Sequence, residues 1–485
     1  MKLSFPGNLS LLTCLCLTTV ITYAQPAYEI KANIKPFRQG HLYLAHHFGS
    51  KQYLVDSALI NSKGDAVFSG NEKLKGGVYM IAFPEKNGWI ECIIDKQQRF
   101  SVTADTADQV ASIAYTGSSD NVLFADYQKQ SYQTGMAISE MRNKLVNASP
   151  ADAEKIRADI QARGMTLQRY RENFIKAHPE HLLSAIFHVL KEPVIPPAEK
   201  HPGAKYDSVF AYRYYMEHYW DDISLTDERL IRTPVFQSRI DRYFDDLLPQ
   251  HPDTLSRAAG MLIDKSKGNP EMFKYLLSHL TDKYVNPRYM GQDAVFVHLF
   301  EKYYLTGQAD SWMNEKYRKF IFDRGYSLMA NIVGKPAGDF EFIDTAGRKR
   351  NLYGVDAPYI VLCFWDPTCG HCKEEVPRLD SLYRAKWKSR GVRIVGMMTD
   401  GGKDAWLKFI REHDLKDWLH VYQTQELKDA DMAAKRPSYR QLYDVYQTPT
   451  IFLLDREKRI LAKKITYQQT DELLQLKFRE DDGKK

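Results

Sequence analysis

A pair of cysteines in a Cys-X-X-Cys arrangement is the feature of this sequence best suited to chemistry. Cys369 and Cys372 stand directly after an apolar, strand-like run at 359–364, and the residues that follow them have the spacing of an amphipathic helix. A helix that begins at the pair places the first sulfur among unpaired backbone N–H groups at the positive end of the helix dipole, which favours the thiolate. The sequence therefore predicts that Cys369 is the nucleophile of a disulfide exchange and that Cys372 is the resolving thiol.

Two other uses of a Cys-X-X-Cys pair are disfavoured by the residues around it. A structural zinc site needs four closely set Cys or His ligands, and the other cysteines beyond the first twenty residues, Cys92 and Cys363, are not paired in sequence. Haem attachment needs a histidine directly after the second cysteine, and Lys373 stands there. We expect no metal and no cofactor other than the redox-active disulfide of Cys369 and Cys372.

Further motifs downstream and upstream make the pair more specific. Thr448-Pro449 leads into an apolar run at 451–454, Pro377 follows the second cysteine by five positions, and residues 334–347 read as an opening hairpin. Together with the cysteines, these features resemble the thioredoxin fold, and in particular the envelope thioredoxins similar to TlpA and ResA. The resemblance covers about residues 333 to 480.

The resemblance implies a role for each matching residue. It makes Cys369 the attacking cysteine, Cys372 the resolving cysteine, Pro449 the cis-proline, and Thr448 the residue whose backbone pairs with an extended substrate segment. Glu375 matches an acidic residue that helps to manage protons in the ResA-like group. A solvated position on the helix surface is the alternative for Glu375, and the sequence leaves both readings open.

The chain departs from the thioredoxin pattern in two places. Cys363 stands where cytosolic thioredoxins have a buried aspartate, so that acid-base group is absent, and we expect Cys363 to be an inert core residue. His371 stands between the cysteines, where it could stabilise the thiolate of Cys369 and make the disulfide more oxidising. Trp365, which precedes the motif, completes the expected supporting residues of the site.

The first residues predict export. A short apolar stretch after Met1-Lys2 and the small residues before Gln25 read as a signal peptide, residues 1–24, cleaved after Ala24. No later segment is apolar for the roughly 18 residues that a membrane span needs. We expect a periplasmic or cell-envelope protein without a membrane span in the mature chain and without a lipid anchor on Cys14.

Hydrophobic periodicity divides the rest of the chain into three expected domains. Short alternating runs and turns predict an all-β, sandwich-like domain at 25–117, helical periodicity predicts an all-α region at 118–332, and an α/β thioredoxin fold is expected at 333–480. The first two resemble the uncharacterised β and helical domains that precede envelope thioredoxins of Gram-negative bacteria. The charged tail at 477–485 is expected to be disordered.

Composition narrows the possible functions. The net charge is +6, with 26% charged residues of both signs intermixed, and no basic cluster with interleaved aromatics indicates nucleic-acid binding. A peroxiredoxin would need Pro-X-X-X-Thr-X-X-Cys, whereas Pro367 and Thr368 are adjacent.

We expect an envelope thiol-disulfide oxidoreductase that acts as a reductase, with protein thiol or disulfide clients and a membrane-embedded electron donor. The alternative is an interaction or scaffold protein with an accessory redox module.

Overall fold

The computed structural model describes residues 25–483, so the predicted signal peptide at 1–24 lies outside the described residues. The chain forms two compact units. The first contains the residues up to Pro193 together with Arg229–Ser238, and the second contains Val194–Glu228 and the chain from Arg239 onward. Each unit is described by itself below.

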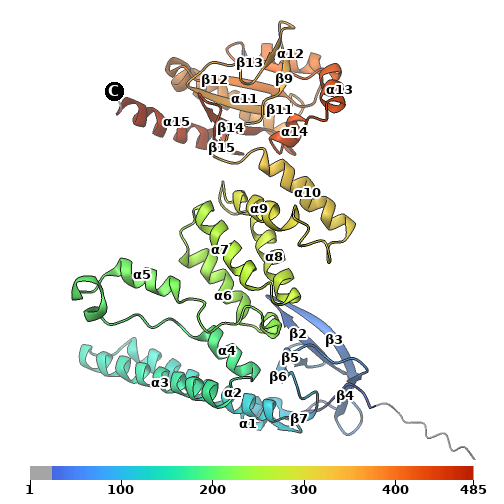
Figure 1. Ribbon diagram of the computed structural model, residues 1–485, viewed down its shortest axis with the longest axis vertical. Coiled ribbons are helices and arrows are strands. Elements are labelled where there is room, and N and C mark those ends of the chain that lie inside the picture. The colour runs from blue at the N-terminus through green and yellow to red at the C-terminus, as the bar shows by residue number, and fades with distance from the viewer. Residues whose placement is uncertain (1–24, 484–485) are drawn as a thin grey trace, which may run out of the picture. The chain divides into compact units, whose positions relative to one another are not determined.

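The first unit is built on two β-sheets that face each other across one apolar core (Figure 1). Alternate residues of the first strand, Ile30, Ala32 and Ile34, are buried, which is the period of two that a half-buried strand requires. The sheets have the strand orders β4-β1-β7-β8 and β3-β2-β5-β6. The strands are β1 (Tyr28–Lys35), β2 (His41–Phe48), β3 (Lys51–Leu59), β4 (Asp65–Gly70), β5 (Gly77–Ala82), β6 (Trp89–Ile94), β7 (Arg99–Asp105) and β8 (Ala114–Thr116).

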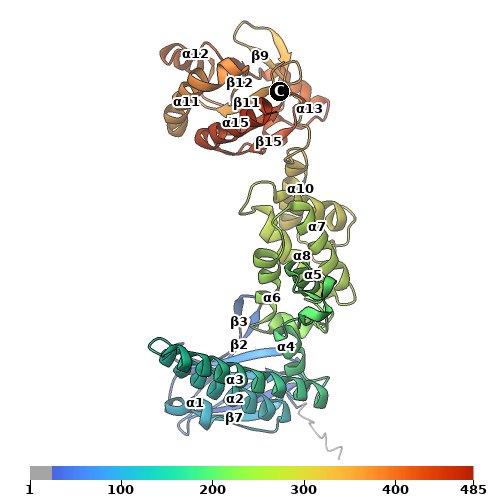
Figure 2. The same ribbon diagram turned by 90° about the vertical axis from the view of Figure 1, so that its left-hand side faces the viewer.

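Helices cover the outer face of the second sheet. After the short helix α1 (Gln109–Ser112), α2 (Ser119–Leu145) and α3 (Pro150–Ala177) run side by side and α4 (Leu182–Leu190) follows (Figure 2). Phe124 and Phe174 pack with Val78 and Ile93 of the strands. The buried Asn121 side chain accepts a hydrogen bond from the backbone N–H of Ile93 and donates one to its carbonyl, which fixes α2 to β6.

The second unit begins with further helices. They are α5 (Ser208–Glu217), α7 (Pro252–Lys265), α8 (Pro270–Val285), α9 (Asp293–Leu299) and α10 (Glu315–Met329), while α6 (Phe236–Arg242) starts in the first unit and ends in the second. Asn269 caps α8 by accepting hydrogen bonds from two backbone N–H groups, and Pro270 takes the first helical position, where its missing N–H costs nothing.

A seven-stranded mixed sheet follows, with the order β10-β9-β13-β12-β11-β14-β15. Its three central strands β11, β12 and β13 are parallel, and β14 pairs antiparallel with β11. All seven residues of β11 are buried, as expected for a central strand that is covered on both faces. The strands are β9 (Glu341–Asp344), β10 (Lys349–Asn351), β11 (Tyr359–Trp365), β12 (Arg393–Met398), β13 (Leu419–Tyr422), β14 (Thr450–Asp455) and β15 (Ile460–Lys463).

Helices cover both faces of this sheet. Side chains from α11 (Gly370–Leu382), α12 (Lys403–Glu412) and α15 (Tyr467–Asp482) form one core with alternate residues of β11. On the opposite face, Tyr439 of α14 (Tyr439–Leu442) stacks on the ring of Phe364, and Tyr443, just after α14, packs against the same ring at a tilt. The structure confirms the predicted fold class: β-sheets first, then helices, then an α/β thioredoxin-like domain. The predicted domain boundaries stay predictions.

Helix α10 is tied to this α/β domain by buried polar contacts. Arg324 Nη1 donates to Asp444 Oδ1 at 2.5 Å, and Ser327 Oγ donates to the same oxygen at 3.1 Å. Nearby, the Lys463 ammonium donates to the carboxylate of Asp293 and to the backbone oxygen of Asn331. The side chain of Asp444 is fully buried, so these contacts anchor the residues that lead into β14.

The expectation of a disordered tail is wrong for residues 477–482. They complete α15, because Phe478 is buried against the ring of Tyr359 and the guanidinium of Arg390. The carboxylates of Asp481 and Asp482 accept hydrogen bonds from the same two residues. The sequence-based expectation counted the many charged residues of this segment and overlooked Phe478, the apolar residue that anchors it.

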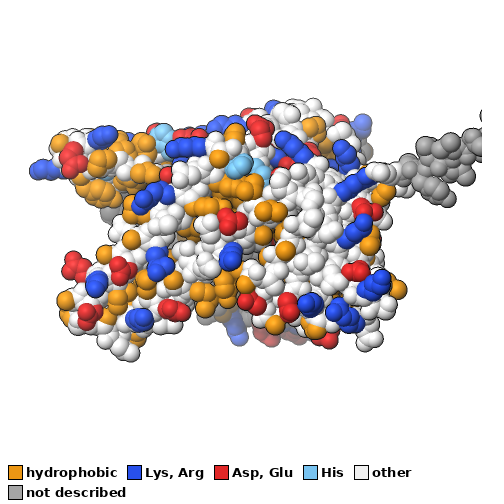
Figure 3. Space-filling model, turned by 90° about the horizontal axis from the view of Figure 1, so that it is seen from below, with side chains coloured by type: hydrophobic (Ala, Val, Ile, Leu, Met, Phe, Trp, Pro, Cys, Tyr) orange, Lys and Arg blue, Asp and Glu red, His pale blue; other side chains and the backbone are white. Residues whose placement is uncertain are grey.

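On the face seen in Figure 3, Lys and Arg side chains alternate with Asp and Glu, and hydrophobic side chains lie between them. Within residues 25–483, no helix is both long enough and apolar enough to cross a membrane.

Candidate active site

The cysteine pair lies where the central strand β11 ends and α11 begins. Cys369 is the N-cap residue of α11, with extended backbone angles (φ −69°, ψ 129°). Its N–H donates to the carbonyl of Asp366 at 3.2 Å, and its own carbonyl accepts the first helical hydrogen bond from Lys373 at 3.1 Å. The predicted start of the helix at the motif is confirmed, and Cys369 faces the unpaired N–H groups of the first turn.

The two sulfur atoms have different surroundings. Cys369 is partly exposed, and its Sγ donates to the carbonyl oxygen of Thr448 at 3.4 Å. Cys372 has no exposed surface, and its Sγ accepts from the N–H of Asp366 at 3.5 Å. A reagent in solution can therefore reach Cys369 and not Cys372.

The same surroundings give the two thiols different pKa values. Partial burial acts to raise the pKa of Cys369. Hydrogen bonds from the backbone N–H groups of Cys372 and His371 and from the side chains of Thr448 and Cys372 outweigh it, so the pKa lies below its usual value. Burial raises the pKa of Cys372 to about 12, and a charge on Cys369 raises it as well. The arrangement makes Cys369 the thiol that ionises and keeps Cys372 protonated.

The loop before β14 lies against the pair. The Thr448–Pro449 peptide bond is cis, which confirms the predicted bond geometry. The register between β11 and β14 places Thr450 opposite Phe364, so the residues before Thr450 reach the end of β11 where the cysteines begin. Thr450 Oγ1 donates to the carbonyl of Gln447 at 2.6 Å and closes the loop.

A turn stabilised by Asp366 connects β11 to Cys369. One carboxylate oxygen of Asp366 accepts hydrogen bonds from the N–H and from the hydroxyl of Thr368, both at 2.7 Å. Gly401 packs against this turn with a positive φ of 86°, and a Cβ there would lie 2.5 Å from Asp366 Oδ1. Only a glycine fits so close an approach.

Trp365 lies at the end of β11, before the pair, and Pro377 lies in α11, after it. The Trp365 ring is fully buried and packs against the rings of Phe409 and His420, at 5.2 and 6.1 Å between centroids. Pro377 lies inside α11, where it removes one backbone hydrogen bond.

Two of the sequence-predicted residues stand at the edge of the site. Glu375 is half-buried on α11, and its charge contributes to the raised pKa of Cys363. The His371 side chain is exposed, and within residues 25–483 its ring makes no hydrogen bond or ion pair. What His371 gives to Cys369 is its backbone N–H. The roles of both side chains stay predictions.

Cys363 lies in β11 with no exposed surface, and burial raises its pKa well above the usual value. Cys92, Cys363, Cys369 and Cys372 are all free thiols in the described part of the chain. Among residues 25–483, no group of three or more His, Cys, Asp or Glu side chains is arranged to hold a metal ion.

Sequence reasoning missed Arg440. Its guanidinium donates to the carboxylate of Asp400 at 2.5 Å, to the carbonyl of Thr399 at 3.3 Å, and to the carbonyl of Val445 at 3.5 Å. Arg440 thus joins the end of β12 to the segment that leads to Thr448. No local motif indicates this role, because two of its partners, Thr399 and Asp400, are about 40 positions away in the sequence.

Three family models match successive parts of the chain. Residues 28–124 match a domain of unknown function (DUF4369), residues 184–323 match another (DUF5106), and residues 333–463 match the AhpC/TSA family.

Curated relatives match the last of these parts. The thiol-disulfide oxidoreductase ResA of Bacillus cereus is 29% identical over 141 residues, which is 29% of this chain and 74% of the relative. ResA of Bacillus subtilis is 27% identical over 141 residues, covering 29% of this chain and 71% of the relative.

Solved structures include a thioredoxin-like protein from Bacteroides caccae, 22% identical, which covers 59% of this chain and 98% of that chain with a TM-score of 0.43. The thioredoxin domain of a thiol-disulfide oxidoreductase from Bacteroides vulgatus is 27% identical and covers 29% of this chain and 96% of that chain, with a TM-score of 0.25. The family model and the curated relatives show that residues 333–463 form a thioredoxin-like domain of the AhpC/TSA type that resembles the thiol-disulfide oxidoreductase ResA.

Proposed function

We propose that this protein is a thiol-disulfide reductase of the cell envelope that acts on disulfides of other proteins through Cys369 and Cys372. The observation that carries the proposal is the unequal pair. Cys369 is accessible and has a lowered pKa, whereas Cys372 is buried and has its pKa raised to about 12. An attacking thiolate must be accessible and ionised, and a resolving thiol must be protected until it is needed.

The exchange has two steps. The Cys369 thiolate attacks one sulfur of a client disulfide, a mixed disulfide forms, and the other client sulfur leaves as a thiolate that takes up a proton. Cys372 then loses its proton and attacks the sulfur of Cys369. The Cys369–Cys372 disulfide forms, the second client sulfur leaves, and the client has gained two electrons while the protein has lost two.

The loop at Thr448 is suited to hold the client during these steps. Its carbonyl oxygen lies 3.4 Å from Cys369 Sγ, and within residues 25–483 its N–H has no hydrogen-bond partner. A client segment in an extended conformation can pair with this N–H and bring its own sulfur to Cys369, which is strand addition on a small scale.

Export and re-reduction complete the proposal. The residues at 1–24 are a signal peptide, the mature protein begins at Gln25 in the periplasm, and a membrane-embedded thiol donor reduces the Cys369–Cys372 disulfide after each turnover. Mass spectrometry of the mature protein from its native host tests the cleavage, since an N-terminus other than Gln25 contradicts the predicted processing.

The direction of exchange is tested by the reduction potential of the pair. Equilibration with defined ratios of reduced and oxidised glutathione, followed by alkylation and mass spectrometry, gives the value. A reductase should lie near the roughly −270 mV of thioredoxin, whereas a potential near the roughly −120 mV of a strong oxidant would overturn the proposed direction.

A further inference from the structure

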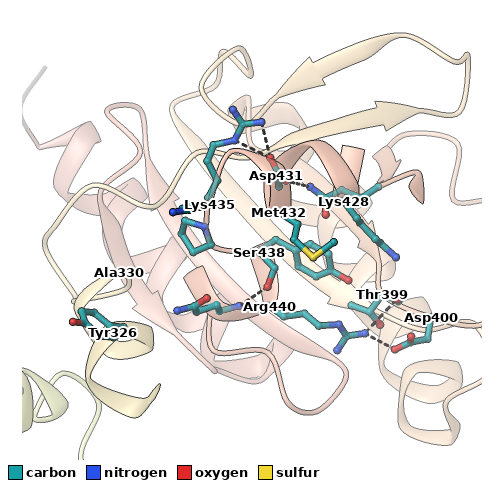
Figure 4. A pocket seen from close by; sticks show the side chains of 15 residues that line it. Tyr326, Ala330, Thr399, Asp400, Lys428, Asp431, Met432, Lys435, Ser438 and Arg440 are labelled. Atoms are coloured by element: carbon teal, nitrogen blue, oxygen red, sulfur yellow. Dashed lines mark hydrogen bonds and ion pairs between the residues drawn. The ribbon is translucent and has the colours of Figure 1, made fainter. Parts of the chain in front are cut away.

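A pocket with a volume of about 810 Å³ lies beside the redox site, in the second unit. Figure 4 shows that its walls come from α10, from the end of β12, from α13 (Gln425–Ala433) and from the residues that follow α13. Its size falls in the range of about 300–1,000 Å³ that is typical of ligand sites. We refer to it as the basic pocket, because Lys428, Lys435, Arg436 and Arg440 line it.

The floor of the basic pocket is continuous with the turn that carries Cys369. Thr399 lines the pocket, and its N–H donates to the carbonyl of Trp365 at 2.9 Å. Asp400 also lines it and is followed by Gly401, which packs against Asp366 and Pro367. Through Thr399 and Gly401, the wall of the pocket contacts the turn at 365–367 that leads to Cys369.

Arg440 connects the same floor to the other side of the redox site. Its guanidinium binds Thr399 and Asp400 in the pocket and also the carbonyl of Val445, three residues before Thr448. Arg440 therefore links the pocket to the segment that leads to Thr448, whose carbonyl lies against Cys369.

The charges of the pocket are predominantly positive. Its lining holds four cationic side chains, Lys428, Lys435, Arg436 and Arg440, against two carboxylates, Asp400 and Asp431. Arg440 pairs with Asp400, and Arg436 pairs with Asp431. Lys428 and Lys435 are exposed, and among residues 25–483 neither forms an ion pair, so two positive charges remain for a ligand.

Apolar surface adjoins these charges. Met432 of α13 is 73% exposed and Tyr326 of α10 is 49% exposed, and both line the pocket. A long thioether and an aromatic ring adapt to side chains of many shapes. The pocket thus combines positive charges, which favour acidic ligands, with an apolar surface that accommodates side chains of different shapes. This combination suits a polypeptide better than one small molecule.

We propose that the basic pocket binds an acidic stretch of the client polypeptide, next to the client disulfide that Cys369 attacks. This inference rests on the proposed function and names the class of client that it favours. Complementary charge raises the rate of encounter between two molecules more than it lengthens their contact. The preference should therefore appear in the second-order rate constant of client reduction.

The test uses three synthetic peptides, each closed by one internal disulfide and otherwise alike, with Asp and Glu, Ser, or Lys beside the cysteines. The reduced full-length protein is mixed with each peptide, and the rate of peptide reduction is followed by acid quenching and chromatography. The Lys428→Glu/Lys435→Glu variant reverses both unpaired charges. The Lys274→Glu/Lys316→Glu variant is the matched control, because these exposed lysines of α8 and α10 lie outside the pocket and, within the described residues, also lack ion pairs.

We expect the wild-type protein to reduce the acidic peptide about 10-fold faster than the lysine peptide at low salt, and the pocket variant to lose or invert this order. The control variant should keep the order, and about 1 M salt should remove it in all proteins because charges are then screened within roughly 3 Å. Equal rates for the three peptides, or equal losses in the pocket and control variants, would overturn the pocket assignment.

Alkylation by iodoacetamide, a small uncharged reagent, separates this inference from the proposed function. Its rate at Cys369 should be the same in the wild type and in both variants, because none of the four lysines touches the sulfur. Failure to reduce any peptide while Cys369 remains reactive would overturn the proposed reductase function itself. Reduction without charge preference would overturn only the role of the basic pocket.

Discussion

Cys369 Sγ and the carbonyl oxygen of Thr448 lie 3.4 Å apart, although the two residues are 79 positions apart in the chain. Cys369 stands at the start of α11, and Thr448 precedes the first residue of β14 by two positions. The central strand β11 brings them together, because it ends at the cysteines and pairs with β14. The thiol and the backbone that would present a client are thus fixed by one strand pair.

The two cysteines should behave differently when one is removed. Cys372→Ala leaves the accessible thiol and removes the resolving one, so incubation with a protein disulfide should accumulate mixed disulfides, visible on non-reducing gels and by mass spectrometry. Cys369→Ala should accumulate almost none, since Cys372 has no exposed surface. Trapping by Cys369→Ala alone would reverse the proposed roles.

His371→Pro should raise the pKa of Cys369 and lower the reduction potential of the pair. Proline lacks the backbone N–H that His371 gives to the sulfur. A hydrogen bond to a charged group contributes about 1.5–3 kcal/mol, which corresponds to roughly 1–2 pKa units and about 30–60 mV.

His371→Ala is the control for this change, because it removes the ring and keeps the N–H. If the alanine variant shifts the potential as far as the proline variant does, the imidazole and not the backbone stabilises the thiolate. Glutathione equilibration measures both potentials.

The pH dependence of alkylation should separate the two thiols. Only the thiolate reacts, so the rate rises with pH through the pKa of the reacting group. In Cys372→Ala, half-maximal reactivity should fall below the ordinary thiol value of about 8.5. In Cys369→Ala, Cys372 should stay nearly unreactive at pH 9, because burial raises its pKa to about 12. Comparable rates at pH 9 would contradict the buried position of Cys372.

Asp444→Asn should destabilise the contact between α10 and the thioredoxin-like domain. The buried carboxylate accepts from Arg324, Ser327 and Lys464, and removing one partner of a buried ionic group costs roughly 3 kcal/mol. Asparagine retains the shape and tolerates the positive φ of 51° at this position. Denaturant unfolding measures the loss, with Asp323→Asn, on an exposed pair with Lys319, as the control.

The stability lost in Asp444→Asn should also depend on pH. Burial acts to raise the pKa of Asp444, but its contacts with Lys464, Arg324 and Ser327 lower it below the usual value. The charged form therefore stabilises the fold above the unfolded pKa of about 3.9, and this contribution is lost as the pH falls through the folded pKa. The stability difference between wild type and Asp444→Asn should be full at pH 7 and should narrow below about pH 4. A difference that is constant with pH would mean that the charge contributes nothing.

The sequence identified those parts of the site that depend on local pattern. Cys369, Cys372 and Thr448-Pro449 each stand beside an apolar run that reads as a strand, and strand pairing brings them together. The sequence did not reveal Arg440 or the basic pocket, since an ion pair between a short helix and a distant turn, such as Arg440 with Asp400, depends on tertiary placement and not on hydrophobic periodicity. It also misjudged residues 477–482, where one buried ring, Phe478, outweighs many charges.

The high pKa of Cys372 also sets the order of events in the proposed exchange. At pH 7, a thiol with a pKa of about 12 is ionised in roughly one molecule in 100,000, so the resting pair holds its second nucleophile in reserve. Part of that pKa comes from the sulfur of Cys369, through its charge and its hydrogen bond. When Cys369 enters a mixed disulfide, its charge disappears and Cys372 becomes easier to ionise. Formation of the mixed disulfide therefore lowers the barrier to ionising Cys372, whose attack on Cys369 then releases the client. In the proposed exchange, the first step thus prepares the second.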